Sequence, residues 1–305
     1  MNRILILFSV FSVFATANLF AVEYDRVTTK MTQLMAAYPN LTQSMSIGTN
    51  DQNAQILGLK IEKKNIYQDS IEKRRFLLVG THHGNERLSA DLALRFAEDL
   101  LKRFAGTTSY ESEEIAGLED AIFYVVPVLN IDGFNANRRE DKTSSGQSID
   151  PNRDYPDVCV DQPSFRLKST ANLARFIDQE NIVGAVTVHG YVGTFTYPWG
   201  IYTDDTKTLD DAFFKNVTNR AVLFNNYRTG THTAVIYAAA GAFEDYAYHK
   251  FGVWTTLLEL ARSPKLDRDS LAMLSYFADL PAERSNQHQH LGNCTHTWGE
   301  FPSRP

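Results

Sequence analysis

The feature that most constrains the fold of this 305-residue chain is a regular alternation of two apolar patterns. Short, nearly continuous apolar runs are typical of strands buried on both faces, whereas apolar residues at helical spacing indicate amphipathic helices. The runs with strand character are 56–61, 75–80, 122–128, 182–188 and 253–260. The segments with helical character are 25–37, 88–104, 169–178, 210–224 and 268–280. This alternation predicts an α/β fold with a mixed, largely parallel central sheet flanked by helices.

The composition is that of an ordinary globular chain. Apolar residues make up 43% and charged residues 22%, so the chain has enough apolar material for a packed core and disorder is not expected. The formal net charge of −6 argues against a nucleic-acid partner, because such proteins usually carry a basic excess. We find no internal repeat and no linker rich in proline, glycine or serine, and we therefore expect one domain.

The N-terminus has the pattern of a secretory signal peptide. Arg3 precedes an apolar run over 4–14, and small residues with an Ala-x-Ala site follow up to Ala21. The alternative is a membrane anchor, but the run is shorter than the roughly 20 residues that a span requires. We therefore expect a signal peptide at 1–21 and a catalytic domain at 22–305. The mature protein should be secreted or periplasmic, without stable membrane association.

The chain contains two cysteines, Cys159 and Cys294. An exported protein can keep a disulfide bond, and this one would tie the C-terminal tail to the middle of the chain. The alternative is two separate buried thiols. The sequence leaves the choice open, because it does not supply the geometry that a disulfide requires.

Polar side chains gather where the expected strands end. His83 and Glu86 follow one strand, Asn130 follows a second, His189 ends a third and Glu259 lies near the end of a fourth. Functional groups in largely parallel sheets gather at the carboxyl ends of the strands. Core packing alone does not explain this arrangement, so we expect these side chains to form a functional site.

Two of these residues have the spacing of a metal-binding pair. His83 and Glu86 form a His-x-x-Glu pattern, which lets an imidazole and a carboxylate on one turn reach the same ion. Taken alone, such a pair is more often part of a polar loop, and a single histidine after a strand is more often structural. With His189 as a third ligand, however, the set matches a catalytic zinc site, which keeps three protein ligands and an open position.

The order of several short motifs resembles that of the zinc metallocarboxypeptidases related to carboxypeptidase A. The resemblance runs from about residue 25 to residue 262, which is nearly the whole expected mature chain. Each motif is short, but their combination is specific. The motifs are His83-Gly84-Asn85-Glu86, Asn130-Ile131-Asp132-Gly133, Asp150-Pro151-Asn152-Arg153, His189-Gly190-Tyr191, Ile236-Tyr237 and Leu258-Glu259-Leu260.

This resemblance implies the metal and the catalytic carboxylate. His83, Glu86 and His189 match the family's three ligands of one Zn²⁺ per chain. His82 is a competitor for the first position, since it could share a face with Glu86, but the family pattern selects His83. Glu259 matches the carboxylate that takes a proton from the zinc-activated water and passes it to the leaving amine.

The resemblance also implies how a peptide substrate with a free C-terminal carboxylate is held. Asn152 and Arg153 match the pair that binds this carboxylate, which a guanidinium can grip with two hydrogen bonds. Tyr237 matches the tyrosine that closes over the substrate. For the arginine that stabilises the oxyanion, both Arg138 and Arg139 are candidates, and Arg139 is favoured because Glu and Asp follow it.

Side-chain specificity is the remaining question. Glu244 stands seven residues after Tyr237, at the position that the family places at the base of its specificity pocket. A carboxylate there favours a basic C-terminal residue, unless the loop turns Glu244 towards solvent and Asp245 makes only structural hydrogen bonds. The principal alternative function is a murein peptide carboxypeptidase or amidase that acts on diaminopimelate-containing peptides.

Overall fold

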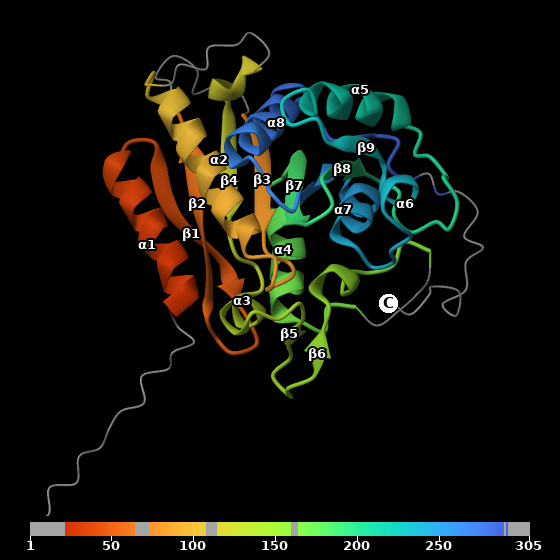
Figure 1. Cartoon of the computed structure of the whole chain (residues 1–305), viewed down its shortest axis with the longest axis horizontal. Coiled ribbons are helices and arrows are strands. Elements are labelled where there is room, and N and C mark those ends of the chain that lie inside the picture. Colours follow the sequence, from red (N-terminus) through yellow and green to blue (C-terminus); the bar gives the residue numbers. More distant parts are fainter. Residues whose placement is uncertain (1–21, 65–72, 108–114, 160–163, 290, 292–305) are drawn as a thin grey trace, which may run out of the picture.

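The computed structural model describes residues 22–64, 73–107, 115–159, 164–289 and 291. An eight-stranded sheet lies at the centre of the molecule (Figure 1). Its strands, in spatial order, are β1 (Thr42–Thr49), β2 (Gln55–Glu62), β4 (Ala121–Val126), β3 (Arg74–Gly80), β7 (Gly184–Gly190), β10 (Trp254–Leu260), β8 (Thr194–Tyr197) and β9 (Arg228–Thr231). A separate two-stranded sheet joins β5 (Asp141–Lys142) to β6 (Ser148–Ile149).

The middle of the large sheet is parallel and its flanks are mixed. The neighbours β4, β3, β7 and β10 all run in the same direction. Strands β1, β2 and β4 pair antiparallel, as do β10 and β8, whereas β8 and β9 are parallel. The expected mixed, largely parallel α/β sheet is therefore confirmed, and the carboxyl ends of β3, β7 and β10 lie side by side.

Two groups of helices pack around this sheet. Helix α2 contacts α1 and α8, and α8 also contacts α5, whereas α4 contacts β1 and α7, and α7 contacts β10. The helices are α1 (Val22–Ala37), α2 (Leu88–Phe104), α3 (Ile131–Ala136), α4 (Lys168–Gln179), α5 (Asp211–Ala221), α6 (His232–Val235), α7 (Phe243–Phe251) and α8 (Leu266–Ala278). Each segment expected from the sequence overlaps one of the observed elements.

The core is built around an aromatic cluster. Phe76 on β3 lies 5.3 Å from Phe123 on β4 and 5.1 Å from Phe277 on α8, measured between ring centroids. Phe96 on α2 completes the cluster, 5.7 Å from Phe277. All four side chains are buried, so they fix α2 and α8 against the parallel strands. The cluster lies near the amino ends of β3 and β4, whereas the polar residues stand at the carboxyl ends of the parallel strands.

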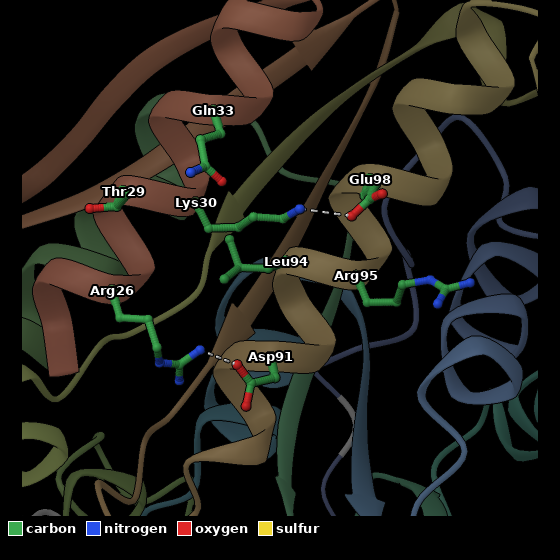
Figure 2. Close-up of a pocket in the computed structure, with 8 residues that line it drawn as sticks. All are labelled: Arg26, Thr29, Lys30, Gln33, Asp91, Leu94, Arg95 and Glu98. Atoms are coloured by element: carbon green, nitrogen blue, oxygen red, sulfur yellow. Dashed lines mark hydrogen bonds and ion pairs between the residues drawn. The ribbon is translucent and has the colours of Figure 1, made fainter.

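A charged groove separates α1 from α2 (Figure 2). Its volume is about 470 Å³, and ion pairs bridge it from Arg26 to Asp91 at 2.6 Å and from Lys30 to Glu98 at 3.1 Å. These side chains are partly exposed, and exposed ion pairs contribute only about 0–1 kcal/mol. None of the side chains expected to carry function lines this groove.

Two expectations for the ends of the chain fall partly outside the described residues. The expected signal peptide at 1–21 lies there, as does Cys294. Cys159, the chain's other cysteine, is disulfide-bonded. Among the helices that the structure describes, none has the length and apolar character needed to cross a membrane.

Candidate metal centre and active site

The sheet brings the expected site residues to one edge. Gly80 ends β3 and pairs with Val188 on β7, so the loop that carries His83 starts beside His189. His189 in turn pairs directly with Glu259 on β10. Register partners on neighbouring strands direct their side chains to the same face, so the backbone alone sets His189 beside Glu259.

His83, Glu86 and His189 form a buried cluster. The Nδ1 atoms of the two histidines lie 3.1 Å apart. The Glu86 carboxylate lies 2.8 Å from Nδ1 of His83 and 3.1 Å from Nδ1 of His189. One candidate ligand atom from each residue lies within 4.8 Å of the others, and this is the one such group found among the described residues.

The cluster fits zinc. Two imidazole nitrogens and one carboxylate are the donor set of many catalytic zinc sites. Burial alone would raise the pKa of the Glu86 carboxyl, but the neighbouring His83 and His189 lower it below its usual value, which favours the ionised ligand form. The backbone N–H of Gly190 donates to the same carboxylate at 3.2 Å and orients it.

The loop that carries His83 and Glu86 is folded tightly against α3. A side chain at Gly84 would place its Cβ 2.0 Å from the Gly133 backbone and 2.3 Å from that of Phe134, so only glycine fits. Asn130 caps α3 by accepting from the Gly133 N–H at 2.7 Å, and its amide donates to the carbonyl oxygens of His82 and Arg139 at 3.1 Å. Asn130 thus connects the start of α3 to the backbone of His82 and Arg139.

Asp150 is a site residue to which the sequence assigned no role. Its Oδ1 lies 3.1 Å from Nε2 of His83, and its Oδ2 accepts from the Arg139 guanidinium at 2.7 and 2.9 Å. A carboxylate on the far nitrogen of a metal-binding histidine fixes the orientation of the ring. Burial alone would raise the pKa of Asp150, but His83, Arg153 and Arg139 lower it well below its usual value. The available signal was its place at the start of the Asp150-Pro151-Asn152-Arg153 motif.

The two adjacent arginines point to different partners. Arg139 is held by Asp150 and directs Nη1 to 3.1 Å from Nδ1 of His83 and 3.6 Å from Glu86. Arg138 instead pairs with Asp132 at 2.5 Å. Of the two candidates for the oxyanion role, Arg139 is the one beside the buried cluster of His83, Glu86 and His189.

His82, the competing ligand, does not join the cluster. Its Nε2 lies 3.0 Å from the hydroxyl of Tyr155, and its ring stacks on His189 with centroids 5.4 Å apart. Burial lowers the pKa of His82 well below its usual value, and the charges of His189 and His83 act in the same direction. His82 is therefore a neutral, buried support for the ring of His189.

The first turn of α7 lies against Asn152. The side-chain oxygen of Asn152 accepts from the Phe243 N–H at 2.8 Å, and its amide lies 3.5 Å from the Glu244 carboxylate. Glu244 is 5% exposed, accepts a hydrogen bond from Thr187 on β7, and forms no ion pair with a described cation. Asp245 accepts from the Gly200 N–H, and burial raises its pKa to about 7.

Tyr237 contacts Arg153, which stands three residues after Asp150. The Arg153 guanidinium donates to the Tyr237 hydroxyl at 3.2 Å and lies 5.9 Å from the centre of its ring. Tyr237 is 41% exposed, so it is the more accessible side of the pair. Arg153 belongs to a 3-10 turn, Pro151–Arg153, which directly follows Asp150.

Fold and site together define an α/β protein with the donor set of a mononuclear metal centre at the carboxyl ends of its parallel strands. Residues 27–278 match the family model of the zinc carboxypeptidases, and the chain therefore belongs to that family.

Individual relatives are distant. Carboxypeptidase B of Astacus astacus is 25% identical over 262 residues, which cover 76% of this chain and 82% of that protein. Carboxypeptidase D of Mus musculus is 25% identical over 190 residues, which cover 59% of this chain but 13% of that much longer protein. The chain thus spans only a small part of the length of carboxypeptidase D.

The fold is also similar to that of solved structures. The crystal structure of thrombin-activatable fibrinolysis inhibitor superposes with a TM-score of 0.70 at 16% identity, and the match covers 87% of this chain and 76% of that one. At this level of identity, the similarity concerns the fold alone.

Proposed function

We propose that this chain is a secreted zinc metallocarboxypeptidase, with a catalytic domain at 22–305, that hydrolyses the C-terminal peptide bond of peptides. The observation that carries the proposal is the buried cluster of His83, Glu86 and His189, linked through Asp150 to the turn that bears Arg153. A metal-binding cluster and a guanidinium that suits a terminal carboxylate are the two elements that such an enzyme requires.

Each chemical role falls to a residue of this chain. When bound, zinc would supply Lewis-acid chemistry by polarising a carbonyl group and acidifying a water molecule. Glu259 accepts a proton from the attacking water and then gives it to the leaving amine. Arg139, whose orientation Asp150 fixes, donates hydrogen bonds to the negative charge that develops on the carbonyl oxygen.

Recognition of the chain end falls to three residues. Arg153 and the Asn152 amide bind the terminal carboxylate, and Tyr237 covers it. Asn152 is already tied to α7 through its oxygen, so its position is set before the substrate binds. Such preorganisation lowers the entropy lost on binding.

Replacing Arg153 with alanine should raise KM for peptides with a free C-terminus roughly 30-fold or more, because truncation of a buried charge contact costs at least about 2 kcal/mol. For C-terminally amidated peptides, the same substitution should change KM much less. Steady-state kinetics on matched free and amidated peptides tests this expectation. Arg166→Ala is the control, since the side chain of Arg166 is 42% exposed and pairs with Asp154. Wild-type cleavage of amidated peptides as fast as free acids would contradict the exopeptidase proposal.

We further propose that the enzyme prefers basic C-terminal residues. Glu244 is a buried carboxylate with hydrogen bonds from Thr187 and Asn152 but no ion pair among the described residues. A buried charge is costly unless an opposite charge compensates for it, and a lysine or arginine side chain of the substrate would do so. The reported relatives do not favour the murein alternative.

Glu244→Gln should therefore reduce kcat/KM for peptides that end in Lys or Arg by about 10-fold or more and leave peptides that end in Leu or Phe almost unchanged. Glutamine keeps the shape and an acceptor for Thr187 but removes the charge. The control is Asp245→Asn, which changes the adjacent carboxylate without changing the preference. A wild type that prefers Leu or Phe would refute this specificity.

The proposal that the protein is exported depends on the signal-peptide pattern at residues 1–21. Sequencing the N-terminus of protein recovered from outside the cytoplasm tests it, and the expected mature chain begins at residue 22.

A further inference from the structure

His232 lies directly against the tyrosine that is proposed to cover the substrate. The edge of one ring meets the face of the other, with centroids 5.6 Å apart and planes at 77°. Tyr237 also contacts Arg153 through its hydroxyl and its ring. The phenol is therefore held from two sides, by a guanidinium and by an imidazole.

His232 is itself fixed to the sheet. Its Nδ1 lies 3.3 Å from the hydroxyl of Thr196 on β8. A Cβ built on Gly200 would lie 3.3 Å from the His232 side chain, so the glycine at this point lets the imidazole lie against the backbone. The next residue, Thr233, donates to the carbonyl oxygens of Gly200 and Tyr202 at 2.9 and 2.8 Å. The segment that starts α6 is thus anchored to the end of β8.

We propose that His232 is a positioning residue that holds the Tyr237 ring over Arg153 before a substrate arrives. This inference rests on the proposed function, in which Tyr237 and Arg153 bind the C-terminal carboxylate. α6 is only four residues long and Tyr237 stands just beyond it, so the helix itself gives the tyrosine little support. A half-exposed tyrosine without such a contact would sample several rotamers, and binding would then have to order it.

A double-mutant cycle tests whether His232 acts through Tyr237. His232→Ala should raise KM for free C-terminal peptides roughly 2- to 10-fold, the range expected for one edge-to-face ring contact, and should change kcat less than about twofold. In a Tyr237→Ala background, the same change should have no further effect, because nothing remains to be positioned.

Two conservative variants separate ring contact from general structure. His232→Phe keeps a ring against Tyr237 but loses the polar contact with Thr196, and it should restore KM to near the wild-type value. His232→Asn keeps a polar group near Thr196 but loses the ring, and it should behave like His232→Ala. Rescue by asparagine and not by phenylalanine would overturn the proposal.

The outcomes distinguish this inference from the function on which it rests. If Tyr237→Ala raises KM and His232→Ala adds its full effect on top, His232 does not act through Tyr237 and the inference fails, while the proposed function stands. If Tyr237→Ala has no effect on free peptides, the proposed role of Tyr237 fails. The rate at which Tyr237 is nitrated, measured by mass spectrometry, is a test that does not depend on enzyme activity. His232→Ala should raise the rate of Tyr237 nitration, and an unchanged nitration rate would overturn the inference.

Discussion

Replacing Glu259 with glutamine is expected to lower kcat by about 10²- to 10⁴-fold, the range of a general acid–base contribution. Glutamine has nearly the same size but cannot accept the proton of the attacking water. Glu259 stands on β10 directly across from His189, so the substitution should leave the strand pairing and the metal cluster intact. Zinc content and thermal stability should therefore remain close to those of the wild type.

The measurement is kcat on a free C-terminal peptide, together with elemental analysis of the same preparation. Glu180→Gln is the matched control, because Glu180 lies at the end of α4 and accepts from the Tyr124 hydroxyl. It should keep full activity. A Glu259→Gln enzyme with near-normal kcat would show that another group handles the proton.

Replacing His189 with alanine should weaken zinc binding by at least about 100-fold, since even residues that merely orient a ligand are worth 10- to 100-fold. In the proposed site His189 supplies one of three ligands, and its Nδ1 lies 3.1 Å from Nδ1 of His83 and 3.1 Å from the Glu86 carboxylate. Zinc per chain after dialysis against a chelator should fall from one to a small fraction, and activity should fall with it.

The control for this experiment is His82→Gln. His82 is the other buried histidine beside the cluster, but it bonds to Tyr155, and glutamine can keep that hydrogen bond. This variant should retain one zinc per chain. If His189→Ala keeps its zinc and His82→Gln loses it, the ligand assignment is wrong.

The strands at the centre of the sheet could be predicted from the sequence because they are apolar on both faces. β4, for example, is buried at every position, and its run of apolar residues is easily recognised. β8 and β9 could not be predicted, since they are four residues long and rich in threonine. α7 was missed for another reason: it buries Glu244 and Asp245 in its first turn, so its apolar residues do not follow a helical period.

His83 and Glu86 could be predicted as neighbours in a site because they are three residues apart and follow a recognisable strand, and the buried cluster that they form with His189 fits a metal site. The contact of Asp150 with His83 could not be predicted from the sequence. The two residues are 67 positions apart, and only the folded loop brings them together. The same holds for His232, whose neighbours Thr196 and Tyr237 come from different elements. Local spacing suggests candidate ligands, whereas the groups that contact those candidates depend on the tertiary structure.

The direct pairing of His189 with Glu259 has a consequence for how this chain can diverge. The proposed metal ligand and the proposed proton acceptor are one inter-strand spacing apart, and the hydrogen-bond ladder between β7 and β10 sets that separation. Loops around the site can therefore change in length without altering that separation. A single residue inserted within either strand would turn one of the two side chains to the opposite face of the sheet. Tolerance to insertion should thus change abruptly at the ends of these two strands.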